Sequence, residues 1–298
     1  MSKKTRLGLS VALVALTIAV FVYYLSKHRS LLTSLRRTSP VVILWVLLLY
    51  VLIFGVILLI LHVSLRMCRK RVGAKENLQL NAYALFVNFF MPGQGGPAIR
   101  GLYLKKRHGL KIRSYVLVSL LYYAMYAVVS AFLLLAGSRP WWWTVLGVLA
   151  AGGGSWLVIH IYMRRSKLHE DALDLRPRLL LALLGVTALQ TVLQIALYGV
   201  ELQAVNPHIG FVQIMTYTGA ANFSLFVALT PGAIGIRESF LLFSERLHHI
   251  GSTTIVAANV IDRGVYLIFL GALFVLTLVL HAKKSLQLKR LQASKPEA

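Results

Sequence analysis

Residues 88–101 read NFFMPGQGGPAIRG, a run that places two prolines, four glycines and an arginine inside an otherwise apolar region. Proline removes a backbone donor and stops a helix, whereas glycine permits turns and close backbone approach. Irregular backbone at membrane depth must be buried in protein or line a wet cavity, because lipid offers it no hydrogen-bond partner. We therefore expect the chain to turn back inside a protein-lined polar space at this point.

The composition places the chain in a membrane. Of its 298 residues, 58% are hydrophobic and 14% are charged, whereas a soluble domain is about 45–50% apolar and about 25% charged. The formal net charge is +23, but the basic residues flank apolar segments, as they do on the cytoplasmic side of membranes, where they attract anionic lipid. We expect an anionic lipid surface as a partner and no nucleic acid. We expect no cofactor and no metal, since no metal-ligand spacing occurs.

The apolar segments predict an all-α polytopic fold. A spanning helix needs about 20 mainly apolar residues. The six segments that qualify as full spans are 7–25, 41–63, 114–136, 141–163, 179–200 and 253–281. Two further segments, 78–91 and 209–230, are apolar but interrupted: the first runs into PGQGGP, and the second holds TGAAN at its middle and runs into PGAIG.

The spacing of these segments indicates an internal duplication within a single membrane domain. Residues 1–136 and residues 137–282 each give a span, a span, an interrupted segment and a span, followed by a basic cytoplasmic tail at 283–298. If both interrupted segments are re-entrant, each half has three full spans, so the second half is inverted relative to the first. Inverted repeats with Gly/Pro-broken segments near the midplane are a transporter design.

The distribution of Lys and Arg favours the re-entrant arrangement. With both termini in the cytoplasm, 24 Lys and Arg residues lie on the cytoplasmic side and 7 lie outside. If residues 209–230 spanned the membrane fully, the basic tail would lie outside, against the positive-inside tendency. The point that fits least well is the 26–40 loop, which places four basic residues outside.

The two breaks are the predicted binding site. Helices beginning after them, near Ala98 and Ile236, would direct amide N–H groups into the polar space, where Arg100 and Arg237 add cationic donors suited to phosphate. The alternative is that these arginines only reach toward headgroups on their own sides. The residues that form the breaks are Pro92, Gly93, Gly95, Gly96, Pro231, Gly232 and Gly235.

A second group of polar residues lies in or beside the last span. Asp262 and Arg263 are adjacent, so they do not face each other on a helix and each needs another partner. We expect Glu238 to pair with Arg263, and Arg100 or Arg237 to pair with Asp262. Intramembrane charges are costly and indicate function by default, although a static ion pair that fixes packing is the alternative.

Several uncharged polar residues lie close to the breaks or within a span. Asn88 and Asn222 precede the two breaks, where they could bond loose backbone or contact a ligand. Gln190 and Gln194 lie on one helix face and are expected to link helices. We identify no catalytic residue, because no Ser/His/Asp arrangement has suitable spacing.

With these residues in hand, the chain resembles the lysylphosphatidylglycerol synthase transmembrane-region family. The resemblance rests on residues 88–111, NFFMPGQGGPAIRGLYLKKRHGLK, and residues 229–243, LTPGAIGIRESFLLF, together with the span pattern. The family's arginine after the first break, its glutamate after the second and its downstream arginine are matched by Arg100, Glu238 and Arg263. Two departures are Pro97, where the family often has an acidic residue, and LLYYAMY at 120–126, where the family has an arginine.

The resemblance implies transbilayer movement of a polar lipid in a bacterial cytoplasmic membrane. The cargo would be a polar or anionic lipid, such as an aminoacyl-phospholipid or a polyprenyl-phosphate carrier, and the protein would not be an enzyme. One alternative is an accessory subunit that docks an envelope-biosynthesis enzyme, and a homo-oligomer is also open. The less favoured alternative is an intramembrane lipid-modifying enzyme.

Overall fold

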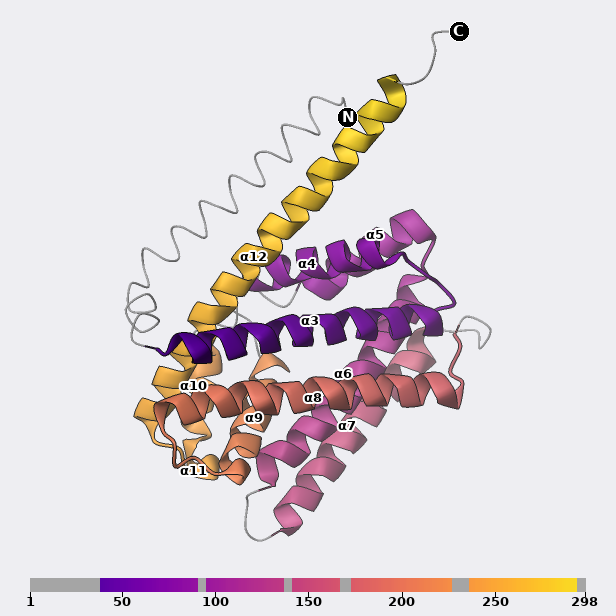
Figure 1. The fold of residues 1–298 in the computed structure, drawn as a ribbon. Coiled ribbons are helices and arrows are strands. Elements are labelled where there is room, and N and C mark those ends of the chain that lie inside the picture. The colour runs from indigo at the N-terminus through magenta and orange to yellow at the C-terminus, as the bar shows by residue number, and fades with distance from the viewer. Residues whose placement is uncertain (1–37, 91–94, 137–140, 167–172, 227–235, 294–298) are drawn as a thin grey trace.

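The computed structural model describes residues 38–90, 95–136, 141–166, 173–226 and 236–293, which form helices and no strand (Figure 1). This confirms the all-α prediction. The helices are α3 (Pro40–Met67), α4 (Ala74–Phe90), α5 (Gly96–His108), α6 (Ile112–Leu135), α7 (Trp142–Ser166), α8 (Pro177–Val205), α9 (Phe211–Phe226), α10 (Ile236–Phe243), α11 (Glu245–His248) and α12 (Ser252–Ala293).

Five of these helices are long and apolar enough to cross a membrane: α3, α6, α7 over 142–164, α8, and α12 over 252–279. They correspond to five of the six predicted spans, whereas the first, 7–25, lies outside the described residues. Helix α12 continues to Ala293, so residues 283–293 of the predicted basic tail extend the last span as helix.

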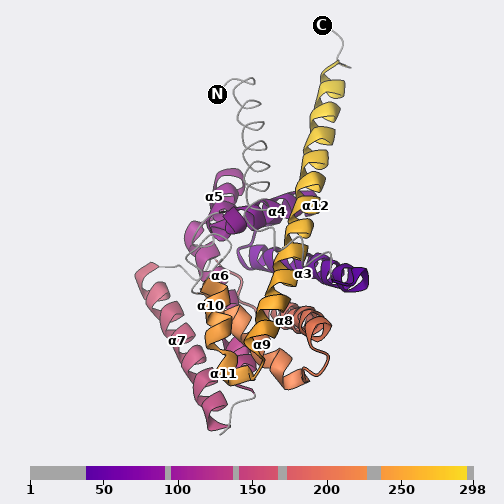
Figure 2. The ribbon, with the colours of Figure 1, turned by 90° about the vertical axis from the view of Figure 1, so that its left-hand side faces the viewer.

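The helices are arranged around a central pair. Helices α3 and α8 pack side by side and run in opposite directions, and α12 crosses both of them (Figure 1). Helix α6 packs against α7 and α9, and α7 lies at the edge of the bundle (Figure 2). The most apolar window of α7 has no buried residue, as expected for a helix that faces lipid rather than a core.

Helices α4 and α5 form an antiparallel hairpin held by polar links along its length. Near its open end, Glu76 of α4 accepts hydrogen bonds from Tyr103 (2.8 Å) and His108 (2.9 Å) of α5. Near its closed end, the Gly96 N–H donates to Asn88 Oδ1 at 2.7 Å. Helices α4 and α5, on either side of the first break, therefore pack against each other. Pro92 and Gly93 of the break lie outside the described residues.

The open end of this hairpin gives a pH-dependent contribution to stability. Partial desolvation opposes the charged form of Glu76, but hydrogen bonds from His108 and Tyr103 outweigh it and lower the pKa of this carboxyl below its ordinary 4.5. A lowered folded-state pKa stabilises the fold above the ordinary value, and the gain is lost as the pH falls through the lowered value. We expect Glu76→Gln to lower the melting temperature slightly at neutral pH, and we expect this difference to shrink as the pH falls below 4.5 and through the lowered pKa. Melting curves over a pH series test this, and an equal loss at every pH would contradict it.

The second interrupted segment differs from the prediction. Helix α9 is unbroken from Phe211 to Phe226 and passes straight through TGAAN, residues 218–222. Glycine stands there because α9 crosses α6 closely: a Cβ on Gly219 would lie 2.2 Å from the backbone N of Leu134. The sequence signal taken for an interruption therefore marks a helix crossing. The second break itself, with Pro231, Gly232 and Gly235, lies outside the described residues.

Candidate functional site: two adjoining polar cavities

Two adjoining cavities at the centre of the bundle have mainly apolar walls that carry several polar side chains. Cavity A, of about 160 Å³, lies between the α4–α5 hairpin, α3 and α6 and contains Arg100. Cavity B, of about 260 Å³, lies between α3, α8, α10 and α12 and contains Arg237 and Asp262. They are neighbours, because both are lined by Ile57, Leu85, Asn88, Gln190 and Leu225.

Arg100 brings a positive charge to cavity A. Its Nη1 donates to Asn81 Oδ1 at 2.6 Å, and Asn81, which is fully buried, donates in turn to the carbonyl and side-chain oxygens of Asn77. Neutral amides thus orient the guanidinium, and no carboxylate of the described residues pairs with it. Its buried Nε has no hydrogen-bond partner there either. Cavity A therefore presents an uncompensated cation with donor capacity to spare.

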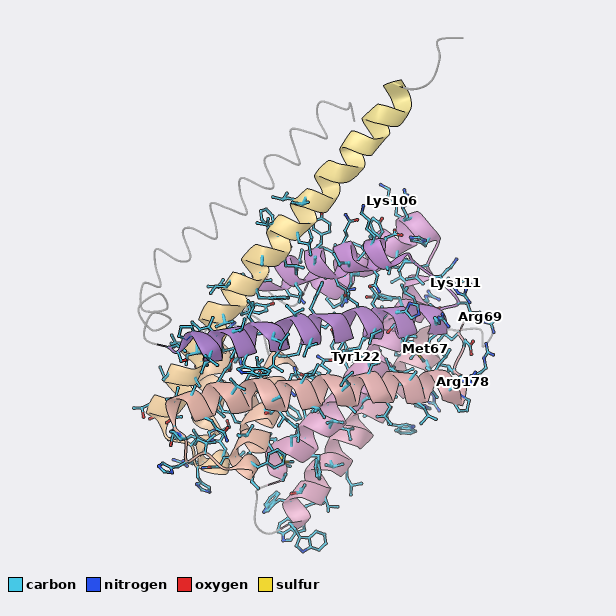
Figure 3. The ribbon with its side chains drawn as sticks, viewed as in Figure 1. Met67, Arg69, Lys106, Lys111, Tyr122 and Arg178 are labelled. Carbon is cyan, nitrogen blue, oxygen red and sulfur yellow. The ribbon has the colours of Figure 1, made fainter. Side chains whose placement is uncertain are left out.

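The wall of cavity A opposite the hairpin is rich in hydroxyl groups. Tyr122 of α6, labelled in Figure 3, donates to Gln190 Oε1 of α8 at 2.8 Å. One turn along, Tyr126 and Gln194 exchange hydrogen bonds at 3.1 and 2.9 Å. Tyr115, Tyr123 and Ser119 complete this wall. Hydroxyls and amides can each donate to an anion without bringing a second full charge.

Cavity B holds a buried ion pair. Arg237 of α10 donates to Asp262 of α12, and Tyr50 of α3 donates to the other carboxylate oxygen. Arg237 Nη2 also donates to Tyr198 Oη at 3.2 Å. Asp262 is 2% exposed and Arg237 is 8% exposed. The charge of Arg237 is therefore neutralised inside the protein, unlike the charge of Arg100.

A second ion pair lies beside the first. Arg263 Nη2 is 3.2 Å from Glu238 Oε1, and Asn259 Nδ2 donates to the same oxygen at 2.9 Å. The Glu238 side chain is about a third exposed. The two pairs join α10 to α12 through neighbouring residues on each helix.

The structure confirms the pairings expected for the two charged residues of the last span. Arg263 pairs with Glu238, and Arg237 rather than Arg100 pairs with Asp262. The guanidinium of Arg237 is ion-paired with Asp262 in this arrangement, and binding of a headgroup by Arg237 stays a prediction. Gln190 and Gln194 link α8 to α6, as expected.

The two asparagines take different places. Asn88 caps the backbone of the first break and also lines both cavities, so it fits both roles that the sequence left open. Asn222 is fully buried and donates to Gln194 Oε1 at 3.3 Å, away from either cavity wall. Gly95, the described glycine that precedes α5, is its N-cap.

Sequence reasoning did not single out three kinds of site residue. Asn81, which orients Arg100, was not distinguished from other polar residues of an apolar segment. The tyrosines of α6 entered only as part of the LLYYAMY departure. Glu201, which is fully buried near Asp262, lies one residue beyond the end of the predicted span 179–200. One available signal for Glu201 was the scarcity of acids, since the chain has only 9 Asp and Glu residues.

The family model described as the lysylphosphatidylglycerol synthase TM region matches residues 7–273 of the chain. The chain belongs to this family. No curated protein matches it. Membership of the lysylphosphatidylglycerol synthase TM region family, together with the five apolar helices, makes it a multi-pass membrane protein and supports a function that involves membrane lipid.

The two departures from the pattern of the lysylphosphatidylglycerol synthase TM region family fall in one place. Pro97, from the hairpin, and Tyr122, Tyr123 and Tyr126, from LLYYAMY, all line cavity A. Arg100 is the one charged side chain among the described residues that line cavity A.

Proposed function

We propose that the protein moves an anionic lipid across the membrane and that Arg100 binds the phosphate of its headgroup in cavity A. The observation that carries this proposal is a half-buried guanidinium that amides orient and no carboxylate of the described residues neutralises. A guanidinium binds phosphate through two parallel hydrogen bonds, and the hydroxyls of Tyr122 and Tyr123 can add donors. The lipid's acyl chains would remain in the bilayer.

The packing of the helices supports the inverted repeat that this function requires. Exchanging α3 with α8, α4 with α9, α5 with α10, and α6 with α12 maps the observed contacts onto one another. The pair α6–α9 becomes α12–α4, the pair α3–α12 becomes α8–α6, and the hairpin α4–α5 becomes α9–α10; each of these is a contact in the structure. In this proposal both broken segments are re-entrant, and movement of one half against the other exposes the cavities to each side in turn.

The positions of the basic residues favour one orientation of the protein in the membrane. Arg69, Lys106, Lys111 and Arg178 gather at one end of the bundle (Figure 3). We place this end in the cytoplasm of a bacterial cell, with both termini on that side, because short cytoplasmic loops carry an excess of Lys and Arg. Anionic lipid of the inner leaflet would be concentrated beside it.

Reconstitution tests the proposed function. Purified protein is placed in liposomes that carry fluorescent phosphatidylglycerol in both leaflets, and an impermeant quencher reports its movement to the outer leaflet. Arg100→Gln is expected to slow transfer about tenfold or more, because hydrogen bonds to charged groups contribute about 1.5–3 kcal/mol. Lys106→Gln is the matched control, since it removes one positive charge from an exposed position of the same helix.

The outcomes separate transport from its alternatives. Equal transfer by the wild type and Arg100→Gln would refute cavity A as the headgroup site. A change in the mass of the lipid would point to an enzyme. The geometry of Ser119, a hydroxyl on the wall of cavity A, does not favour this outcome, because Ser119 donates to the Tyr115 carbonyl oxygen and not to a side chain that could act as a base. Activity that appears only when an envelope-biosynthesis enzyme is added would favour the accessory role.

A further inference from the structure

Glu201 is a buried carboxyl group to which the proposed function gives no role. It lies in the last turns of α8, is fully buried, and among the described residues its carboxylate oxygens have no hydrogen-bond partner other than the carboxylate of Asp262. Removing an ionised carboxylate from water without a partner is so costly that the group binds a proton instead. A fully buried acid whose hydrogen-bonding neighbour is another acid therefore needs either a proton or a cation.

The charges around Glu201 favour the proton. The charges of Arg237 and Arg263 are balanced by Asp262 and Glu238, so an ionised Glu201 would be an extra negative charge beside these two ion pairs. The titratable and charged groups around it are Tyr50 of α3, Tyr198 of α8, Tyr217 of α9, Arg237 of α10 and Asp262 of α12. Among these groups the one cation is Arg237, which Asp262 already occupies.

We propose that Glu201 and Asp262 share one proton and compete for Arg237, so that the pair is a proton-binding site of the transporter. In the arrangement described here, Glu201 carries the proton and Asp262 is ionised against Arg237. In the alternative arrangement, Arg237 turns to an ionised Glu201 and the proton moves to Asp262. The net charge of Arg237, Asp262 and Glu201 is zero in both arrangements, so neither arrangement leaves an unpaired charge among these three groups.

The position of the pair connects this exchange to the two cavities. Asp262 and Arg237 line cavity B, which adjoins cavity A. Glu201 lies near the end of α8, whereas Arg178, one of the basic residues gathered at one end of the bundle, lies near its start. Tyr217, whose buried hydroxyl has no partner among the described residues, contacts the rings of Tyr198 and His248 and extends the polar path toward α11. A proton that enters from that end can thus reach the cavity wall by way of Glu201. The inference rests on the proposed lipid transport for its purpose but not for the existence of the site.

Infrared difference spectroscopy tests the site without any lipid substrate. Wild-type protein in nanodiscs is expected to show the C=O band of a protonated carboxylic acid at neutral pH, and Glu201→Gln is expected to lack it. Glutamine is the isostere of the protonated acid, so this variant should fold as the wild type does. Glu245→Gln, which removes a half-buried glutamate of α11, should keep the band.

Asp262→Asn tests the competition for Arg237. With Asp262 uncharged, Glu201 is left as the anion that faces Arg237 and should ionise, so the band should disappear from this variant as well. If the band persists in Asp262→Asn, Glu201 and Asp262 do not compete for Arg237. If the wild type lacks the band, Glu201 is not protonated and the proposed proton-binding site is wrong.

A pH gradient in the phosphatidylglycerol assay tests the coupling. One pH unit corresponds to 1.36 kcal/mol, so transport of one proton per lipid shifts the ratio of probe between leaflets by up to about tenfold per pH unit. The shift should be absent in Glu201→Gln. If lipid transfer by the wild type does not respond to the pH gradient, transfer is not coupled to proton movement. If no transfer occurs at all while the infrared band behaves as expected, the proposed function fails and the proton site stands.

Discussion

Gly219→Ala is expected to cause a large loss of stability, because no space exists for a methyl group where α9 crosses α6. A Cβ at this position would lie 2.2 Å from the backbone N of Leu134, 2.6 Å from its Cα and 2.8 Å from the carbonyl oxygen of Ser130. These are backbone atoms, which cannot move aside as the end of a flexible side chain can. Overpacking typically costs 1–3 kcal/mol, and we expect about 3 kcal/mol or more here.

Thermal unfolding of the purified protein in detergent measures this loss. Gly153→Ala is the matched control: it makes the same change in α7, where nothing lies within 4 Å of the added Cβ. The control should be unchanged or slightly more stable, because alanine favours helix over glycine. A Gly219→Ala protein as stable as the wild type would mean that α6 and α9 do not cross as closely as described.

The same glycine shows how far the fold could be predicted from the sequence. The five described spans were predictable because each is a run of about 20 apolar residues, and this property needs no knowledge of neighbouring helices. Gly219 could either break its own helix or allow a second helix to pack closely against it. Which of the two occurs depends on residues near Leu134, which are distant in the chain. The sequence alone does not contain that contact.

The candidate site was predictable to a similar extent. The pairing of Arg263 with Glu238, and of Asp262 with one of the two arginines that follow the breaks, could be predicted, because charges within a membrane need partners and this chain has few acids to offer. That Arg237 is neutralised while Arg100 is not could not be predicted, since each arginine follows a break of similar sequence. The difference depends on which helix faces each one: α12 brings a carboxylate, whereas α4 brings amides.

Arg237→Gln should cause the largest loss of stability among changes to the charged residues. Asp262 is 2% exposed, and without Arg237 it must remain charged in apolar surroundings or take up a proton from solvent. Removing one partner of a buried ion pair costs about 3–5 kcal/mol. Chemical or thermal unfolding in detergent measures the loss. Arg176→Gln is the control: it breaks an ion pair with Asp174 in which the arginine side chain is 79% exposed, and such surface pairs contribute little.

A double substitution separates the unpaired charge from lost packing. In Arg237→Gln with Asp262→Asn, both charges are removed and two amides of similar size take their places, so most of the stability lost in the single variant should return. Replacing a whole buried pair is often nearly neutral even where removal of one partner is severe. A double variant no more stable than Arg237→Gln would locate the loss in the contacts of Arg237 with Tyr198. Recovery in the double variant would instead mean that the pair is dispensable for folding, and the presence of these two charges would then be explained by the movement of a proton or a lipid.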